Sequence, residues 1–145
     1  MTAFKIIQVA YVSTCRENIT AADVDQIVEA AARHNAELGI TGLLLWRHNQ
    51  FFQVLEGTEL AVDILLRHIR ADSRHSNLTV IYRKQVPKRK FGSWSMGQAT
   101  PTAKTGKALN VLEAVLTDPV TVLNDENELV LDLIESFRRG LWDVR

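Results

Sequence analysis

Several residue types that organise many small proteins are scarce in this chain of 145 residues. The single cysteine, Cys15, excludes an internal disulfide and favours a reducing compartment, so we expect a cytoplasmic protein. Three prolines and seven glycines form neither a flexible linker nor a low-complexity tract. No apolar run approaches membrane-spanning length, and the first residues lack the layout of a signal peptide. We therefore expect one compact unit with no membrane partner.

The formal net charge is zero, because seventeen basic residues balance seventeen acidic ones. Without a long-range positive field, the chain is not expected to hold a nucleic acid or an anionic membrane. The sequence has no glycine-rich phosphate or dinucleotide loop, no Cys/His cluster at zinc spacing and no serine-nucleophile elbow. These absences exclude the common nucleotide, metal and hydrolase sites. What remains is a composition that is 46% apolar, as in an ordinary globular domain.

The hydrophobic pattern before residue 100 predicts five strands and two helices. The expected strands are 6–13, 40–46, 51–56, 78–86 and a short one beginning at 94–96, with 47–50 closing a hairpin. The first helix is expected between an N-cap at Thr20 and a stop at Gly39. The second is capped by Thr58, with an inner side made of Leu60, Ala61, Ile64, Leu65 and Ile69. The order β-α-β-β-α-β-β is typical of a ferredoxin-like α+β sandwich with both helices on one sheet face.

Two further amphipathic helices are expected after residue 100, near 105–116 and 126–139. Pro119 should end the first region, and Asn124 can cap the second. Because the strands are apolar on both sides, these helices are expected to cover the other sheet face. We therefore divide the chain into a core domain, residues 1–100, and a C-terminal helical extension, residues 101–145.

Three polar residues fall where the pattern predicts core. Asn35 lies on the inward stripe of the first helix, Gln53 shares a strand face with Phe51 and Leu55, and Tyr11 alternates with apolar residues. Each alone has a simple structural explanation, such as an amide that satisfies a neighbouring backbone group. In the predicted topology, however, the strands of Tyr11 and Gln53 are adjacent and central, with Asn35 above them. Three converging polar side chains in an apolar setting indicate a pocket for a flat, polar-edged ring.

Five short segments also match a known family in their order and spacing. They are Tyr11-Val12-Ser13, residues 33–35 with 39–44, residues 51–57, Asp72-Ser73-Arg74-His75, and residues 91–96. Over roughly residues 4–99 the chain resembles the BLUF domain, the sensor of blue light using FAD. This resemblance implies non-covalent binding of FAD, with FMN possible as a substitute.

The resemblance also implies roles for individual residues. Tyr11 is similar to the tyrosine that gives an electron and then a proton to the excited flavin, and Gln53 to the switch glutamine beside it. The other implied flavin contacts are Ile27, His34, Asn35, Phe51, His68, Ile69, Asp72 and Arg74. Trp94 and Met96 match the pair that carries the signal outward.

A photoreceptor of this kind is not an enzyme, because relaxation restores the original hydrogen bonds and releases no product. With room only for the sensor and two helices, the chain is expected to signal to a separate effector protein. The apolar tail favours a homodimer or a larger homo-oligomer.

Two alternatives remain at this point. An acylphosphatase-like enzyme could use Arg16-Glu17-Asn18, although Glu17 would repel an anion and no glycine-rich cradle is present. An RNA-binding module could stack bases on Tyr11, Phe51 and Phe52, although the neutral charge argues against it. Several other residues are expected to be solvated or simply packed: Lys88-Arg89-Lys90, Cys15, His48 and His75.

Overall fold

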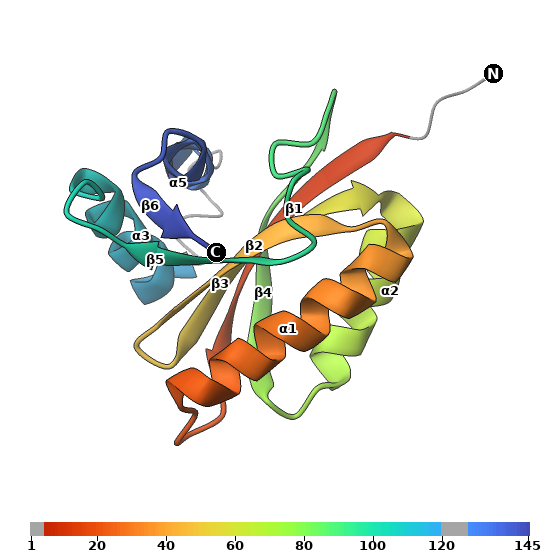
Figure 1. The fold of residues 1–145 in the computed structure, drawn as a ribbon, viewed down its shortest axis with the longest axis horizontal. Coiled ribbons are helices and arrows are strands. Elements are labelled where there is room, and N and C mark those ends of the chain that lie inside the picture. The colour runs from red at the N-terminus through yellow and green to blue at the C-terminus, as the bar shows by residue number, and fades with distance from the viewer. Residues whose placement is uncertain (1–4, 120–127) are drawn as a thin grey trace.

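The computed structural model describes residues 5–119 and 128–145, which form a layered α+β structure (Figure 1). In chain order the elements are β1 (Ile6–Cys15), α1 (Ala21–Leu38), β2 (Thr41–Arg47), β3 (Gln50–Thr58), α2 (Glu59–Ala71), β4 (His75–Val86), β5 (Gly97–Pro101), α3 (Lys107–Thr117), α5 (Glu128–Arg138) and β6 (Trp142–Val144). The predicted order of strands and helices is confirmed. A short C-terminal strand, β6, is added to it.

The strands described here form one mixed sheet in the order β4-β1-β3-β2-β5-β6. The central pair, β1 and β3, is antiparallel, and Tyr11 lies directly opposite Gln53 in its register. On the other side of β1, the register with β4 shifts between Ala10 and Tyr11, so a bulge lies beside this tyrosine. β5 joins β2 in parallel through only two paired positions, Leu43 with Gly97 and Leu44 with Gln98. β6 then pairs with β5 and forms the far edge of the sheet.

Local signals fix the ends of α1 as predicted and also shape the β2–β3 hairpin. Thr20 and Asp23 form a reciprocal capping box at the start of α1, and Gly39 ends the helix with a positive φ of 68°. The β2–β3 hairpin is tighter than the predicted four residues. His48 and Asn49 both adopt positive φ angles, as a two-residue turn between twisted antiparallel strands requires.

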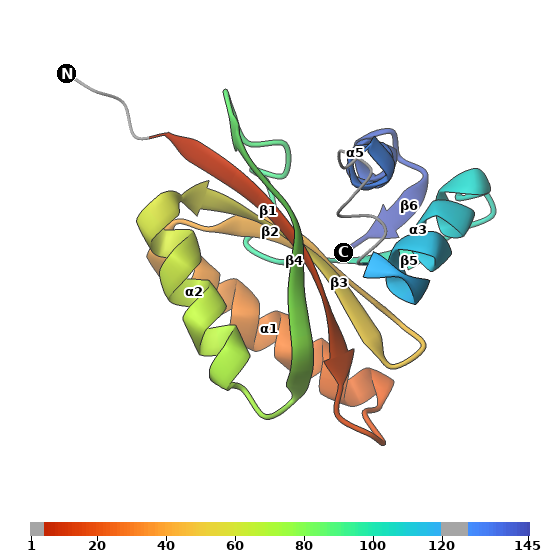
Figure 2. The same ribbon diagram turned by 180° about the vertical axis from the view of Figure 1, so that it is seen from behind.

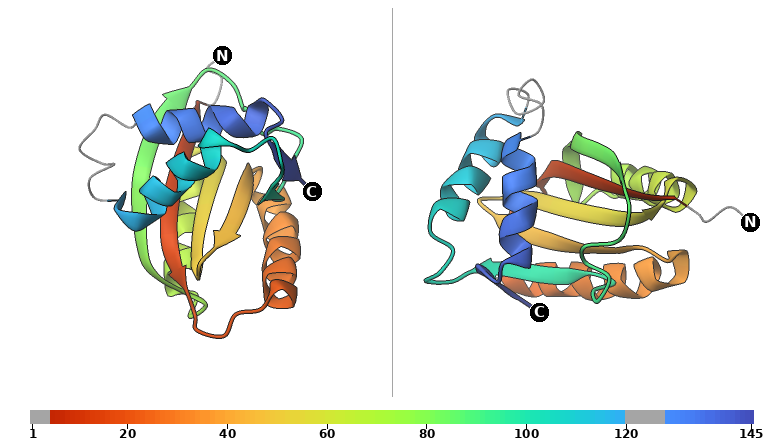
Figure 3. Two further views of the ribbon diagram at one scale, coloured as in Figure 1. Left: turned by 90° about the vertical axis from the view of Figure 1, so that its left-hand side faces the viewer. Right: turned by 90° about the horizontal axis from the view of Figure 1, so that it is seen from above.

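The sheet is covered on both faces (Figures 2 and 3). α1 and α2 lie on one face, over a pocket-side core that includes Val9, Leu44 and Leu55. α3 and α5 lie on the opposite face, over a tail-side core built around Phe52 and Leu133. The predicted placement of the C-terminal helices on the other sheet face is thus confirmed. Burial on both sides explains why consecutive residues of a central strand, such as Val54 and Leu55 on β3, are apolar although they point to opposite faces.

Polar contacts add to this packing where the tail, residues 101–145, meets the sheet. Arg47 on β2 forms a 2.5 Å ion pair with Glu113 on α3, and Lys90 pairs with Glu135 on α5. Within the tail, the indole N–H of Trp142 donates to Ser136 Oγ at 2.9 Å, and both residues are buried.

No helix in the described part of the chain is long and apolar enough to cross a membrane.

Three details of the sequence prediction need correction. Leu60 was placed on the inner side of α2 but is 72% exposed, because the buried stripe runs through Ala61, Val62, Leu65 and Leu66. β5 begins at Gly97, so residues 94–96 precede the strand. The first, third and fourth strands are also longer than expected. The predicted cap at Asn124 lies outside the described residues.

Candidate functional site

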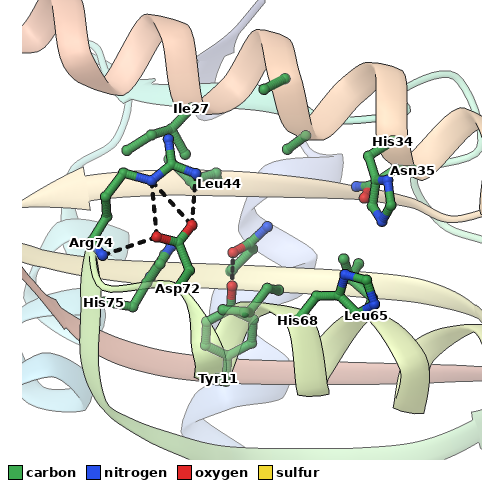
Figure 4. Close-up of a pocket in the computed structure, with 14 residues that line it drawn as sticks. Tyr11, Ile27, His34, Asn35, Leu44, Leu65, His68, Asp72, Arg74 and His75 are labelled. Carbon is green, nitrogen blue, oxygen red and sulfur yellow. Dashed lines mark hydrogen bonds and ion pairs between the residues drawn. The ribbon is translucent and has the colours of Figure 1, made fainter.

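A cavity of about 310 Å³ opens between α1 and α2 above the central strands (Figure 4). This volume lies within the range of about 300–1,000 Å³ that is usual for small-molecule sites. Every residue predicted to contact the cofactor lines the cavity except Phe51: these are Tyr11, Ile27, His34, Asn35, Gln53, His68, Ile69, Asp72 and Arg74. The topology therefore brings together residues from β1, α1, β3, α2 and the start of the loop before β4.

Tyr11 and Gln53 form the floor of the cavity. The Tyr11 hydroxyl donates a hydrogen bond to Gln53 Oε1, and both side chains are almost completely buried. Burial, helped by the negative charge of Asp72, raises the pKa of Tyr11 far above its ordinary value. The phenol therefore keeps its proton at any physiological pH and can act as the donor in this bond.

The other end of the Gln53 amide contacts a methionine. Gln53 Nε2 lies 3.5 Å from the sulfur of Met96, which packs in the pocket-side core with 5% of its surface exposed. Trp94 packs instead against the tail-side core. Of the two predicted signal residues, Met96 is thus the one beside Gln53.

One end of the cavity carries polar atoms that lack partners. Asn35 donates to the carbonyl oxygen of Ser95 at 2.9 Å, but its buried Oδ1 has no hydrogen-bond partner among the described residues. The same holds for the buried Nε2 of His34. The ring of His68, an exposed residue at the rim, lies 5.5 Å from that of His34. Unpaired buried polar groups are costly, so these atoms favour a ligand with complementary polar groups.

The opposite end of the cavity holds an ion pair. Arg74 contacts both carboxylate oxygens of Asp72, the shortest contact being 2.6 Å between Nη2 and Oδ2 (Figure 4). Hydrogen bonds from the guanidinium hold the pKa of Asp72 below its ordinary value, although partial burial opposes them. Beside the pair, His75 bonds Ser13 Oγ through Nδ1 at 3.1 Å. Burial lowers the pKa of His75, which favours the neutral imidazole at pH 7.

The Asp72–Arg74 pair leads to a pH-dependent prediction. In an Arg74→Met variant, the pKa of Asp72 should rise toward its ordinary value, because its main hydrogen-bond donor is gone. Since the folded-state pKa is depressed, the pair stabilises the protein above about pH 4 and loses this effect as pH falls through the lowered pKa. The variant should therefore be less stable than the wild type at pH 7 and equally stable at the acid end.

Carbon-detected NMR titration of the carboxylates and urea unfolding between pH 3 and 7 would measure both effects. Arg70→Met is a suitable control, because Arg70 is an exposed residue of α2 outside the cavity lining. An Asp72 pKa that does not move in Arg74→Met would contradict this account of the pair.

The cavity lining differs from the sequence prediction at several residues, among them Phe51, His75 and Leu44. Phe51 is fully buried beneath the cavity wall, where its ring packs 5.0 Å from that of His75. It lies two residues along β3 from Gln53, so it supports the lining without joining it. His75, expected to be a surface or packing residue, does line the cavity. So does Leu44, and its place opposite Gln53 in the hairpin register could have predicted this. Among residues 5–119 and 128–145, no cluster of His, Cys, Asp and Glu could hold a metal ion.

Comparison with known proteins agrees with this geometry. The family model described as "BLUF: Sensors of blue-light using FAD" matches residues 6–97. The blue light- and temperature-regulated antirepressor BluF of Escherichia coli (strain K12) is 35% identical over 86 residues, which is 59% of this chain. The matched region spans only 21% of that relative's length.

Two solved structures extend the likeness beyond the matched region. The dark-state structure of BlrB, a BLUF protein, superposes with a TM-score of 0.79 at 29% identity, covering 97% of this chain and all of BlrB. Klebsiella pneumoniae BlrP1 with FMN and cyclic diGMP superposes with a TM-score of 0.63 at 29% identity, covering 79% of this chain and 35% of BlrP1. The fold, the cavity and the family match lead to one conclusion: this chain belongs to the BLUF family, the flavin-based sensors of blue light.

Proposed function

We propose that the cavity between α1 and α2 holds the isoalloxazine ring of FAD and that Tyr11 and Gln53 are the residues that respond to light. The observation that carries this proposal is the buried hydrogen bond from the Tyr11 hydroxyl to Gln53 Oε1 on the cavity floor. A phenol and an amide joined in this way can exchange donor and acceptor roles without any residue leaving its strand.

The residues fit a flavin because their unpaired groups match a flat ring with polar edges. Asn35 Oδ1 and His34 Nε2 are buried without partners in the described part of the chain, and both residues line the cavity. Ile27 and Ile69 provide apolar surface from the two helices that flank it. A ring between these helices would thus meet apolar side chains on its faces and polar atoms at its edge.

A bound flavin supplies the absorption of blue light and, once excited, a strong acceptor for an electron and a proton. Tyr11 would give up an electron and its hydroxyl proton, and both would return to it in the dark. The raised pKa of Tyr11 means that loss of the proton alone is unfavourable, so the two must leave together or in close succession.

Gln53 would record the event by a change in its amide. In the present state its oxygen accepts from Tyr11 and its nitrogen points toward Met96. Rotation or tautomerisation of the amide exchanges these donor and acceptor ends. The phenol and the thioether of Met96 then both face altered partners, which offers a route from the cavity to the segment that leads into β5.

Arg74 and Asp72 would receive the ribityl and phosphate part of the cofactor. Arg74 is the one arginine or lysine among the described cavity residues, and a guanidinium is well suited to a phosphate. A single cation does not favour a diphosphate strongly over a monophosphate. We therefore infer that FMN is accepted as well as FAD, in line with the FMN that the BlrP1 structure contains.

We infer that the output goes to another protein and that no substrate is turned over. Met96 and Trp94 would carry the change toward β5 and the tail, where an effector or a second copy of this chain could bind. The E. coli relative is named an antirepressor, which is an example of signalling through a protein partner. The buried free thiol of Cys15 fits a reducing, cytoplasmic location.

The two alternatives find little support in the arrangement of their key residues. Tyr11, Phe51 and Phe52 have at most 1% of their surface exposed, so they offer no platform on which RNA bases could stack. Arg16 is half exposed and its nearest acidic partner is Asp23 at 3.9 Å, which is not the arrangement of a phosphate cradle.

The test of the proposed function is an absorption measurement on the purified wild-type chain. We expect a yellow protein that retains flavin through gel filtration, about one flavin per chain. Blue light should shift the flavin bands to longer wavelength, and darkness should restore them. A colourless protein that takes up neither FAD nor FMN, or a flavoprotein whose spectrum does not change in blue light, would contradict the proposal.

A further inference from the structure

The segment from Arg89 to Met96 runs from the far side of β3 to the cavity and is held at both ends. At its C-terminal end, the Ser95 carbonyl accepts from Asn35 Nδ2 at 2.9 Å, and the Met96 sulfur lies 3.5 Å from Gln53 Nε2. Both partners line the cavity. The path of this segment therefore decides which side chain stands behind Gln53.

The N-terminal end of the segment is held by Glu56, whose side chain has no exposed surface. The backbone N–H of Lys90 donates to Oε2 and that of Phe91 to Oε1, both at 2.8 Å. Gln8 Nε2 donates to Oε2 at 2.9 Å, and Thr41 Oγ1 donates to Oε1 at 3.3 Å. Four donors thus converge on two carboxylate oxygens, which makes this a fully satisfied buried group and a firm attachment point.

Arg89 strengthens the same attachment. Its guanidinium donates to the backbone carbonyl of Glu56 at 2.9 Å and to that of Gly39 at 2.7 Å. Beyond it, the backbone N–H of Trp94 donates to the Phe91 carbonyl at 3.1 Å, and the Trp94 carbonyl accepts from the backbone N–H of Gly42 at 2.9 Å. Hydrogen bonds thus fix the backbone of the segment between residues 90 and 91, which bind Glu56, and Met96, which lies beside Gln53.

Gln53 and Glu56 are three residues apart on β3, so their side chains point to opposite faces of the sheet. Two residues of β3 therefore contact the segment from Arg89 to Met96, Glu56 on one face of the sheet and Gln53 on the other. We propose that Glu56 is a positioning residue for the light response: its grip on residues 90 and 91 keeps Met96 against Gln53 and thereby sets the rate of dark recovery. This inference rests on the function proposed above.

The direct test is a Glu56→Gln variant. The amide nitrogen of glutamine would face N–H donors, so the grip on residues 90 and 91 weakens while the size of the side chain is kept. Met96 then holds the Gln53 amide less firmly, and the amide turns back more easily. We expect unchanged flavin content and dark recovery that is faster by about tenfold, equivalent to about 1.4 kcal/mol in the barrier.

A double-mutant cycle with Met96→Ala separates positioning from general loosening. If Glu56 acts through Met96, Glu56→Gln should change recovery by less than about twofold when Met96 is already absent. Equal effects with and without Met96 would overturn the inference. Ser136→Ala serves as the control, because it removes a buried hydrogen bond to Trp142 and should lower stability without changing recovery.

Arg89→Met is the second variant, in case Glu56→Gln does not fold. It frees the segment from the backbone carbonyls of Gly39 and Glu56 and leaves the Glu56 carboxylate in place, so recovery should accelerate in the same direction. Unchanged recovery in every folded variant, beside a normal wild-type light shift, overturns the inference alone. A wild-type chain with no light shift instead contradicts the proposed function, and the inference with it.

Discussion

A Tyr11→Phe variant should bind flavin like the wild type and show no light-induced spectral shift. Phenylalanine preserves the ring that packs in the pocket-side core, so the cavity keeps its shape. The lost hydroxyl is the group that donates to Gln53 Oε1 and the proposed source of the electron and proton. Absorption spectra before and after blue illumination measure the amplitude, which should fall to the baseline.

The chain offers a matched control in its only other tyrosine, Tyr82. Tyr82 is also buried, at 4% exposure, but lies in the tail-side core on the far face of the sheet. Tyr82→Phe should therefore keep both the flavin and the full shift. If Tyr11→Phe retains the shift, or if Tyr82→Phe abolishes it, the assignment of Tyr11 is wrong.

A Leu133→Ala variant should lose about 3–4 kcal/mol of unfolding free energy, because it leaves a cavity in a well-packed core. Leu133 is fully buried on α5, in the cluster shared by the tail helices and the sheet. For a chain of this size, the midpoint of thermal unfolding should fall by on the order of 10 °C. Urea unfolding followed by circular dichroism measures the loss.

Leu60→Ala applies the same chemical change to a side chain that is 72% exposed. Its effect should stay within about 0.5 kcal/mol. Equal losses in the two variants would mean that the tail does not share a core with the sheet. The boundary near residue 100 stays a prediction, and a single unfolding transition for the whole chain would favour one cooperative unit over two domains.

The fold could be predicted from the sequence where its signals are local. Thr20, Asp23 and Gly39 set the ends of α1 by their own backbone preferences and hydrogen bonds, with no help from distant residues. β6 could not be predicted in this way. It has three residues, too few for a hydrophobic pattern, and exists because Thr100 and its neighbours on β5 offer it a partner. The prediction that Leu60 faces inward was wrong because Leu60 is in the first turn of α2, where an apolar residue can lie outside the buried face of the helix.

The candidate site was predictable where topology alone brings residues together. The prediction that the first and third strands are adjacent was enough to place Tyr11 beside Gln53. The inward-facing positions of the first helix were enough to place Asn35 above them. The path of residues 89–96 was not predictable, because it depends on Glu56, a charged residue in a strand that otherwise reads as core. A carboxylate at such a position indicates a buried hydrogen-bond network, but the sequence does not say which backbone donors complete it.

The two paired positions between β2 and β5 form the shortest joint between neighbouring strands of the described sheet, whereas β1 and β3 are paired along nine positions. The β5–β6 end of the sheet therefore depends on side chains of the tail-side core, such as Ala99 and Trp142, more than on main-chain pairing with β2. This joint begins one residue after Met96. Few main-chain contacts therefore tie β5 to β2 at the point where the segment beside Gln53 enters the sheet.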